Sequence, residues 1–142
     1  MISKLSRNRA AKKRTGAVMV EFAVVAPILF LFFFAAFEFC RVNMIRHTAD
    51  NAVYEAARVA IIPGATSGEA TAEAQLILNS IGLSSSVIEV TPNNIEDDTE
   101  EVTVRVTVSL DDNSFLPNTF VAGKDIVREL TMRREGIRRT TP

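Results

Sequence analysis

The feature that most constrains this chain is an uncharged, apolar run near its start. Between Glu21 and Glu38 lie 16 residues, FAVVAPILFLFFFAAF, and none of them carries a charge. As a helix this run would span about 24 Å, or about 31 Å when residues 17–21 are added. A bilayer core of about 30 Å needs roughly 20 residues. The run therefore predicts a transmembrane helix over residues 17–39, with Glu21 in its first turns.

The charges lie unevenly on the two sides of this run. Residues 1–16 contain six Lys or Arg, among them Lys12, Lys13 and Arg14, and no acidic residue, so they carry +6. The rest of the 142-residue chain has ten basic and 17 acidic residues, so it carries −7 and the total is −1. Basic residues favour the cytoplasmic side of a membrane span. We therefore expect residues 1–16 to be a cytoplasmic leader and the acidic remainder to lie outside the membrane.

Two kinds of cleavable export signal fit this run poorly. A secretory signal needs small residues just after its apolar core, whereas Ala35 and Ala36 are followed by Phe-Glu-Phe. A lipoprotein signal would place small residues before its cysteine, but the same Phe-Glu-Phe precedes Cys40. These departures favour an anchor that is uncleaved, or one that is trimmed at its cytoplasmic end.

Glu21 has two interpretations. A charged residue at the bilayer centre costs about 2.5 to 3.5 kcal/mol, and less near an edge. Glu21 is therefore either tolerated near the membrane edge or has a specific function. In the first case its carboxylate reaches out toward Lys12, Lys13 or Arg14. In the second, the spacing of Gly16, Ala17, Glu21 and Phe22 matters, because it resembles the class III signal of type IV pilins.

The longer string RTGAVMVEFAVVAPILFLFFFAAFEFCRV, residues 14–42, resembles the TadE-like family. These proteins are minor pilins or pseudopilins of the bacterial tight-adherence (Tad) pilus, a type IVb system. The family pattern falls on Arg14, Gly16, Glu21, Phe22, Ala23, Pro27, Glu38, Phe39 and Arg41. The resemblance is strongest over residues 14–60. A Glu-Phe pair in place of the Glu-Tyr of major Tad pilins, and a longer chain than theirs, favour a minor subunit.

The resemblance implies that a prepilin peptidase cuts between Gly16 and Ala17. Glu21 of one subunit would then pair with the new α-amino group of a neighbour, which would fix the register of parallel helices. The implied partners are this peptidase, the major Tad pilin, another minor pilin, the inner-membrane assembly platform and membrane lipid. The implied location is the bacterial inner membrane, as a single-pass protein. The alternative is a permanently anchored, unprocessed envelope protein with an extracytoplasmic binding domain.

The helix is expected to continue beyond the membrane over residues 40–62. Pro27 removes a hydrogen bond to the Ala23 carbonyl, which predicts a kink in the span. Past the span, small and apolar residues share one helical face: Ile45, Ala49, Ala52, Val53, Ala56 and Ala60. This face either contacts a partner or packs on the chain's own domain, whereas Arg41 and the other charged residues lie largely elsewhere. Pro63-Gly64 ends the helix.

Residues 63–134 are expected to form a small domain. Thr66 and Glu69 have capping-box spacing, the next helix has an apolar face, and Gly82 suits its C′ position. Alternation predicts strands at 86–91 and 102–110, with a less regular third strand at about 125–133. This order predicts an α+β fold in which the helices pack on an antiparallel sheet. The tail, residues 135–142, is expected to be flexible.

Catalytic chemistry is not indicated. His47 and Cys40 are the single residues of their types, so we expect a solvated histidine, a buried thiol and no metal site. The acidic segment 95–101 lacks the ligand spacing of a calcium loop and is expected to be a solvated turn between strands. The acidic body has no basic-aromatic patch for nucleic acid. We therefore expect a protein without cofactor or enzymatic activity.

Overall fold

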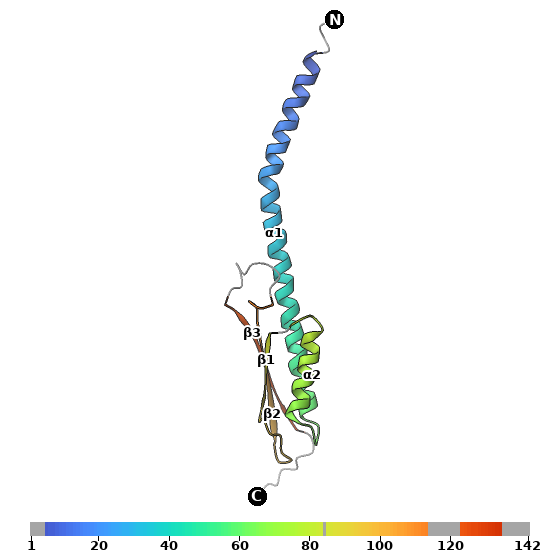
Figure 1. Cartoon of the computed structure of the whole chain (residues 1–142), viewed down its shortest axis with the longest axis vertical. Helices are drawn as coiled ribbons and strands as arrows, with labels where there is room; N and C mark the ends of the chain where they lie inside the picture. The colour runs from blue at the N-terminus through green and yellow to red at the C-terminus, as the bar shows by residue number, and fades with distance from the viewer. Residues whose placement is uncertain (1–4, 84, 114–122, 135–142) are drawn as a thin grey trace. The chain divides into compact units, whose positions relative to one another are not determined.

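The computed structural model describes residues 5–83, 85–113 and 123–134, with side chains from residue 16 onward. It has two helices followed by three strands, which confirms the predicted α+β fold (Figure 1). The elements are α1 (Leu5–Ala60), α2 (Ser67–Asn79), β1 (Ser86–Thr91), β2 (Glu101–Ser109) and β3 (Asp125–Arg133). The chain divides into two compact units, Met1–Phe39 and Cys40–Pro142, and α1 runs through the division. The expected tail, 135–142, lies outside the described residues.

Helix α1 begins at Leu5, so it includes most of the basic leader. That part of the sequence is rich in Ala, Lys and Arg, which are good helix formers, and it contains no proline. Pro27 lies inside the helix, which continues on both sides of it; the kink stays a prediction. The helix ends at Ala60, and Gly64 follows with a positive φ of 83°, so the predicted stop at Pro63-Gly64 is confirmed.

The second unit is built on one hydrophobic core between helices and sheet. All six residues of the predicted α1 stripe are buried, and so are alternate residues of β2. These residues form one cluster with apolar residues of α2, namely Ala70, Ala74 and Leu78. The small side chains of α1 allow its backbone to lie close to its neighbours. The stripe therefore packs on the chain's own domain, as one of the two interpretations predicted.

Helix α2 has both of its predicted end signals. The Glu69 backbone N–H donates to Thr66 Oγ1 at 3.3 Å, and the Thr66 N–H donates to a Glu69 carboxylate oxygen at 3.0 Å. This is a complete capping box. At the other end, Leu83 N–H donates to the Leu78 carbonyl and Gly82 N–H to the Asn79 carbonyl. Gly82, with φ of 76°, therefore occupies the C′ position of a Schellman motif.

Replacing Thr66 with alanine is expected to destabilise the second unit by about 1 kcal/mol, because the Glu69 N–H loses its acceptor. Urea unfolding of the full chain in detergent micelles, followed by circular dichroism, measures the loss. Thr91→Ala is the control, because Thr91 is an exposed threonine that caps no helix. Equal stability of Thr66→Ala and wild type would contradict the importance of this cap.

The sheet is antiparallel in the order β1-β2-β3. On β2, Val102, Val104, Val106 and Val108 are fully buried, while the intervening residues form an outer, largely polar face. Two contacts cross this outer face between β2 and β3. Thr103 and Thr131 hydroxyls lie 2.8 Å apart, and Arg105 Nε lies 2.9 Å from Glu129 Oε2. The alternation read from the sequence is therefore correct for β2.

The acidic segment joins β1 to β2, as predicted. Within this loop the Glu96 N–H donates to Thr99 Oγ1 at 2.9 Å, and the Thr99 N–H donates to the Glu96 carbonyl at 3.1 Å. Arg134, which is buried, donates from Nη1 to the Glu96 carbonyl and from its backbone N–H to the Glu100 carbonyl. The loop is thus held to the end of β3 through its main-chain carbonyls.

The apolar segment of α1 and its processing residues

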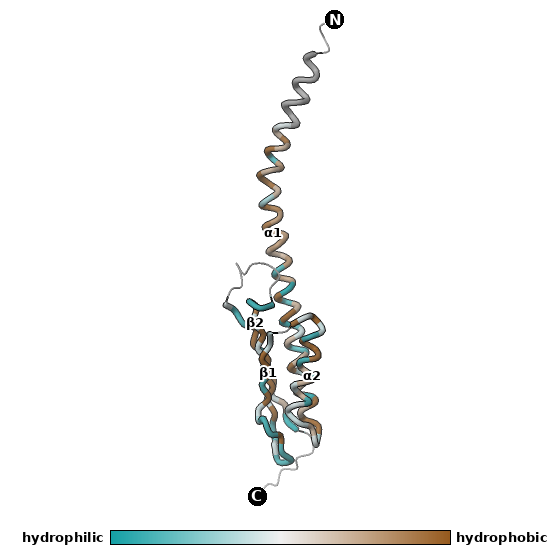
Figure 2. Tube along the Cα trace, viewed as in Figure 1, coloured by the Kyte–Doolittle hydropathy of each residue, from teal (hydrophilic) through white to brown (hydrophobic). Residues whose placement is uncertain are grey.

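The apolar part of α1 is exposed on all sides. Large apolar residues from Val18 to Phe39 are between 46% and 72% exposed, and Figure 2 shows this stretch of α1 as mostly hydrophobic with short hydrophilic interruptions. Exposure of so much apolar surface to water is unfavourable, and such surfaces mark contacts with lipid or another protein. Within the described residues, α1 is the one helix long and apolar enough to cross a membrane.

Phenylalanine rings shape the surface of this segment. The Phe30 and Phe34 ring centroids lie 6.4 Å apart in a stacked arrangement, and Phe33 and Phe34 lie 5.8 Å apart edge to face. A wholly apolar hollow of about 440 Å³ lies nearby, lined by Leu29, Phe30, Phe32 and Phe33. Its lining suits a hydrocarbon chain or an apolar side chain of another helix.

Gly16 and Ala17 lie within α1, and both are exposed. A methyl group on the Cα of Gly16 would meet no other atom within 4 Å. Packing in this chain therefore does not require glycine there, although glycine inside a helix costs about 1 kcal/mol relative to alanine. The residue carries a conformational cost that no contact of the described chain explains.

Glu21 and Phe22 are also exposed on α1. No hydrogen bond or ion pair of Glu21 is found among residues with described side chains. The side chains of Lys12, Lys13 and Arg14 fall outside that set, so the proposed reach of Glu21 toward them stays a prediction. Glu21 and Ala17 are four residues apart and share one face of the helix.

Two charged residues at the end of the apolar run are buried. Glu38 is 7% exposed and Arg41 is 8% exposed, and Arg41 Nη1 donates to the Ile81 carbonyl at 3.5 Å. The expectation that Arg41 lies away from the packed face is wrong. Arg41 precedes the buried Ile45 by four residues, and that spacing puts both side chains on the same helical face.

The single cysteine also differs from expectation. Cys40 is exposed, so the prediction of a buried thiol is wrong. It precedes Ile45 by five residues, which places it about 140° around the helix from that buried side chain. His47 is exposed, as predicted.

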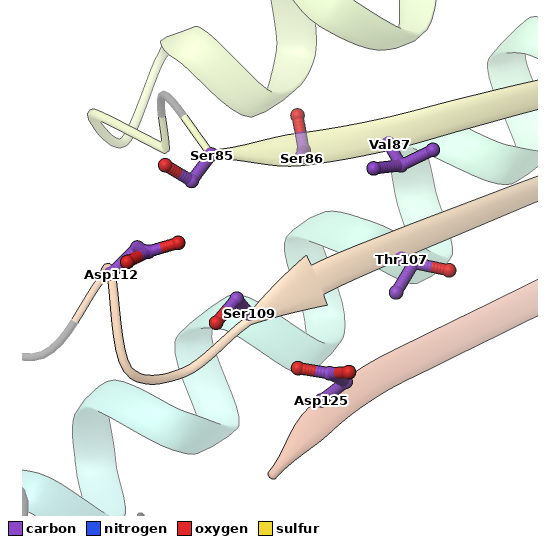
Figure 3. A pocket seen from close by; sticks show the side chains of 7 residues that line it. All are labelled: Ser85, Ser86, Val87, Thr107, Ser109, Asp112 and Asp125. Carbon is purple, nitrogen blue, oxygen red and sulfur yellow. The ribbon is translucent and has the colours of Figure 1, made fainter. Parts of the chain in front are cut away.

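A small polar pocket that the sequence did not suggest lies at one end of the sheet (Figure 3). It has a volume of about 310 Å³ and is lined by Ser85, Ser86, Val87, Thr107, Ser109, Asp112 and Asp125. These residues come from the beginnings of β1 and β3, the end of β2 and the positions just before β1 and after β2. No cluster of three or more metal-binding side chains occurs in the described part of the chain. Two carboxylates and several hydroxyls do not by themselves define a ligand.

Comparison with known proteins gives a match within α1 and none over the sheet. A family model described as TadE-like protein matches residues 16–58. No curated protein and no solved structure matches the chain. The matched segment begins at Gly16, crosses the apolar run and stops two residues before the end of α1. Over residues 16–58 the chain thus matches the TadE-like family, which confirms the resemblance seen in its sequence.

Proposed function

We propose that this chain is a minor pilin or pseudopilin, a non-catalytic structural or assembly subunit of a Tad-type pilus. The observation that carries the proposal is the TadE-like match, which begins at Gly16 and includes the whole exposed apolar part of α1. The +6 leader supports an orientation with the N-terminus in the cytoplasm and the second unit outside the inner membrane.

Processing by a prepilin peptidase between Gly16 and Ala17 is the first step of this proposal. A peptidase needs its scissile bond in a locally unwound backbone, and glycine lowers the cost of unwinding a helix. The lack of any packing reason for Gly16 supports this role. Removal of residues 1–16 would take away all six leader charges and leave an α-amino group on Ala17.

Glu21 would then serve as the counter-ion of that amine on a neighbouring subunit. Each charge alone opposes burial in an apolar environment, whereas the pair offsets part of the desolvation cost. Because the pair forms only at one stagger of two parallel helices, it also fixes their register. Lipid would cover the phenylalanine-rich surface before assembly, and helices of the major pilin or a second minor pilin would cover it afterward.

The test is the mass and N-terminal sequence of the membrane-extracted chain, with and without its prepilin peptidase. We expect a chain that begins at Ala17 only when the peptidase is present. Gly16→Leu is expected to block the cut, because the site then carries a bulky side chain. Gly68→Leu, the same change in α2, is the matched control and should be cut like wild type.

A full-length chain in both samples would overturn the proposal. It would favour the permanent anchor, for which the unbroken course of α1 from Leu5 through Gly16 is equally suitable. Glu21 would then be a tolerated residue near the membrane edge.

A further inference from the structure

Strand β3 forms one edge of the sheet, and its outward backbone groups can be identified. Leu110 N–H donates to the Lys124 carbonyl at 3.1 Å, and Arg134 N–H donates to the Glu100 carbonyl at 2.9 Å. Both pairs continue the β2–β3 register. In an antiparallel pair, residues bonded to the partner alternate with residues whose N–H and C=O point away. The outward residues of β3 are Asp125, Val127, Glu129, Thr131 and Arg133.

An edge of this kind is a template for another strand. In the described part of the chain, no backbone group bonds the outward N–H and C=O groups of β3. One side chain bonds an outward carbonyl of β3. Arg128 Nη1 donates to the outward Val127 carbonyl at 3.2 Å, and Arg128 Nε lies 2.6 Å from Asp50 Oδ1 on α1. A single arginine thus occupies an acceptor in the middle of the edge and ties the strand to the helix.

We propose that the Asp50–Arg128 ion pair guards the β3 edge against pairing with a second copy of this chain. The two side chains are 54% and 36% exposed, and ion pairs this accessible to water contribute little to folding. Blocking a strand edge requires only that the arginine stay in place. This role goes beyond the proposed function and depends on one contact between α1 and β3 within the second unit.

The direction of the strands indicates why a second copy is the partner. Both β1 and β3 are antiparallel to β2, so the two edges of the sheet run in the same direction. The β1 of one copy and the β3 of another can therefore pair without inverting either chain, as copies inserted the same way in one membrane require. Each copy has both edges, so such pairing would repeat head to tail and give species larger than a dimer.

The experiment compares full-length chains in detergent micelles with reductant present, because Cys40 is exposed. Arg128→Ala and Asp50→Ala are each expected to shift the chain to larger species at equal protein concentration, measured by light scattering after size exclusion. Arg105→Ala is the matched control. It breaks the similarly accessible Arg105–Glu129 pair on the outer face, whose contact is between side chains only, and should behave like wild type.

A second variant separates edge pairing from simple unfolding. Thr131→Pro removes an outward N–H of β3 and none of its backbone bonds to β2. It also removes the Thr131–Thr103 hydroxyl contact, which lies on the exposed outer face. Adding it to Arg128→Ala should therefore restore the wild-type size. Circular dichroism should show a folded chain in each variant. Two results would overturn the proposal: wild-type size for both Arg128→Ala and Asp50→Ala, or large species that persist in Arg128→Ala/Thr131→Pro.

Discussion

Under the proposed pilin role, replacing Glu21 with glutamine is expected to abolish incorporation of this chain into a pilus and to leave its membrane insertion intact. Insertion should be equal or slightly better, because a charge near the edge of the apolar run is removed. Assembly should fail, because the α-amino group on Ala17 of a neighbouring subunit would lose its counter-ion. The unpaired amine would oppose burial between helices, and the stagger that the ion pair specifies would be lost.

The measurement is the amount of this subunit in sheared and purified pili, compared with the amount in the membrane fraction. Intact mass of the membrane form shows whether the Gly16–Ala17 cut still occurs, so that a processing defect is not mistaken for an assembly defect. Glu89→Gln removes one carboxylate from the exposed outer face of β1 and is the matched control. Normal pilus content of a processed Glu21→Gln chain would rule out the charge pairing.

Replacing Val104 with aspartate is expected to unfold the second unit. Val104 is 0% exposed and lies at the middle of β2, between the helices and the rest of the sheet. A carboxylate there would be buried without a partner, a cost of about 4 kcal/mol or more. Small domains have about 5 to 15 kcal/mol of total stability, so this change removes a large part of it or all of it.

The matched control uses the same substitution on the other face of the sheet. Val87 is 60% exposed on β1, so Val87→Asp places its carboxylate in water and should change stability little. Limited proteolysis of both variants in membrane vesicles follows the outcome, since an unfolded second unit is cut rapidly while the membrane segment stays protected. Equal resistance of Val104→Asp and Val87→Asp would contradict the described burial of β2.

Local patterns made most of the fold predictable. The run of uncharged residues required a helix, because a single chain segment in lipid can satisfy its backbone N–H and C=O groups only by intrahelical hydrogen bonds. In β2 the strict alternation of valine with polar residues fixed both the strand and its buried face. The capping box of α2 and the stop after α1 depend on residues within a few positions of each other, so they too could be read from the sequence.

Features that depend on contacts between distant residues could not be predicted. Asp50 and Arg128 lie far apart in the sequence, and no local sequence pattern around either residue predicts their ion pair. The carbonyl that Arg41 binds belongs to the turn after α2, so its burial depends on where that turn packs. The polar pocket at the sheet end is formed by three strand ends whose proximity follows from the register. For the processing residues the sequence pattern and the TadE-like match carry the interpretation, because their chemistry involves molecules outside this chain.

The division of the chain at Cys40 has a consequence for the order of events after synthesis. Every buried hydrophobic residue of the core lies at or beyond Ile45, and the partly buried Val42 packs against it. The second unit thus contains its own hydrophobic core, so we expect it to fold without another subunit. The large apolar side chains from Val18 to Phe39, by contrast, remain exposed. Under the proposed pilin role, export would deliver a folded domain on a helix whose apolar surface is covered by protein only on assembly.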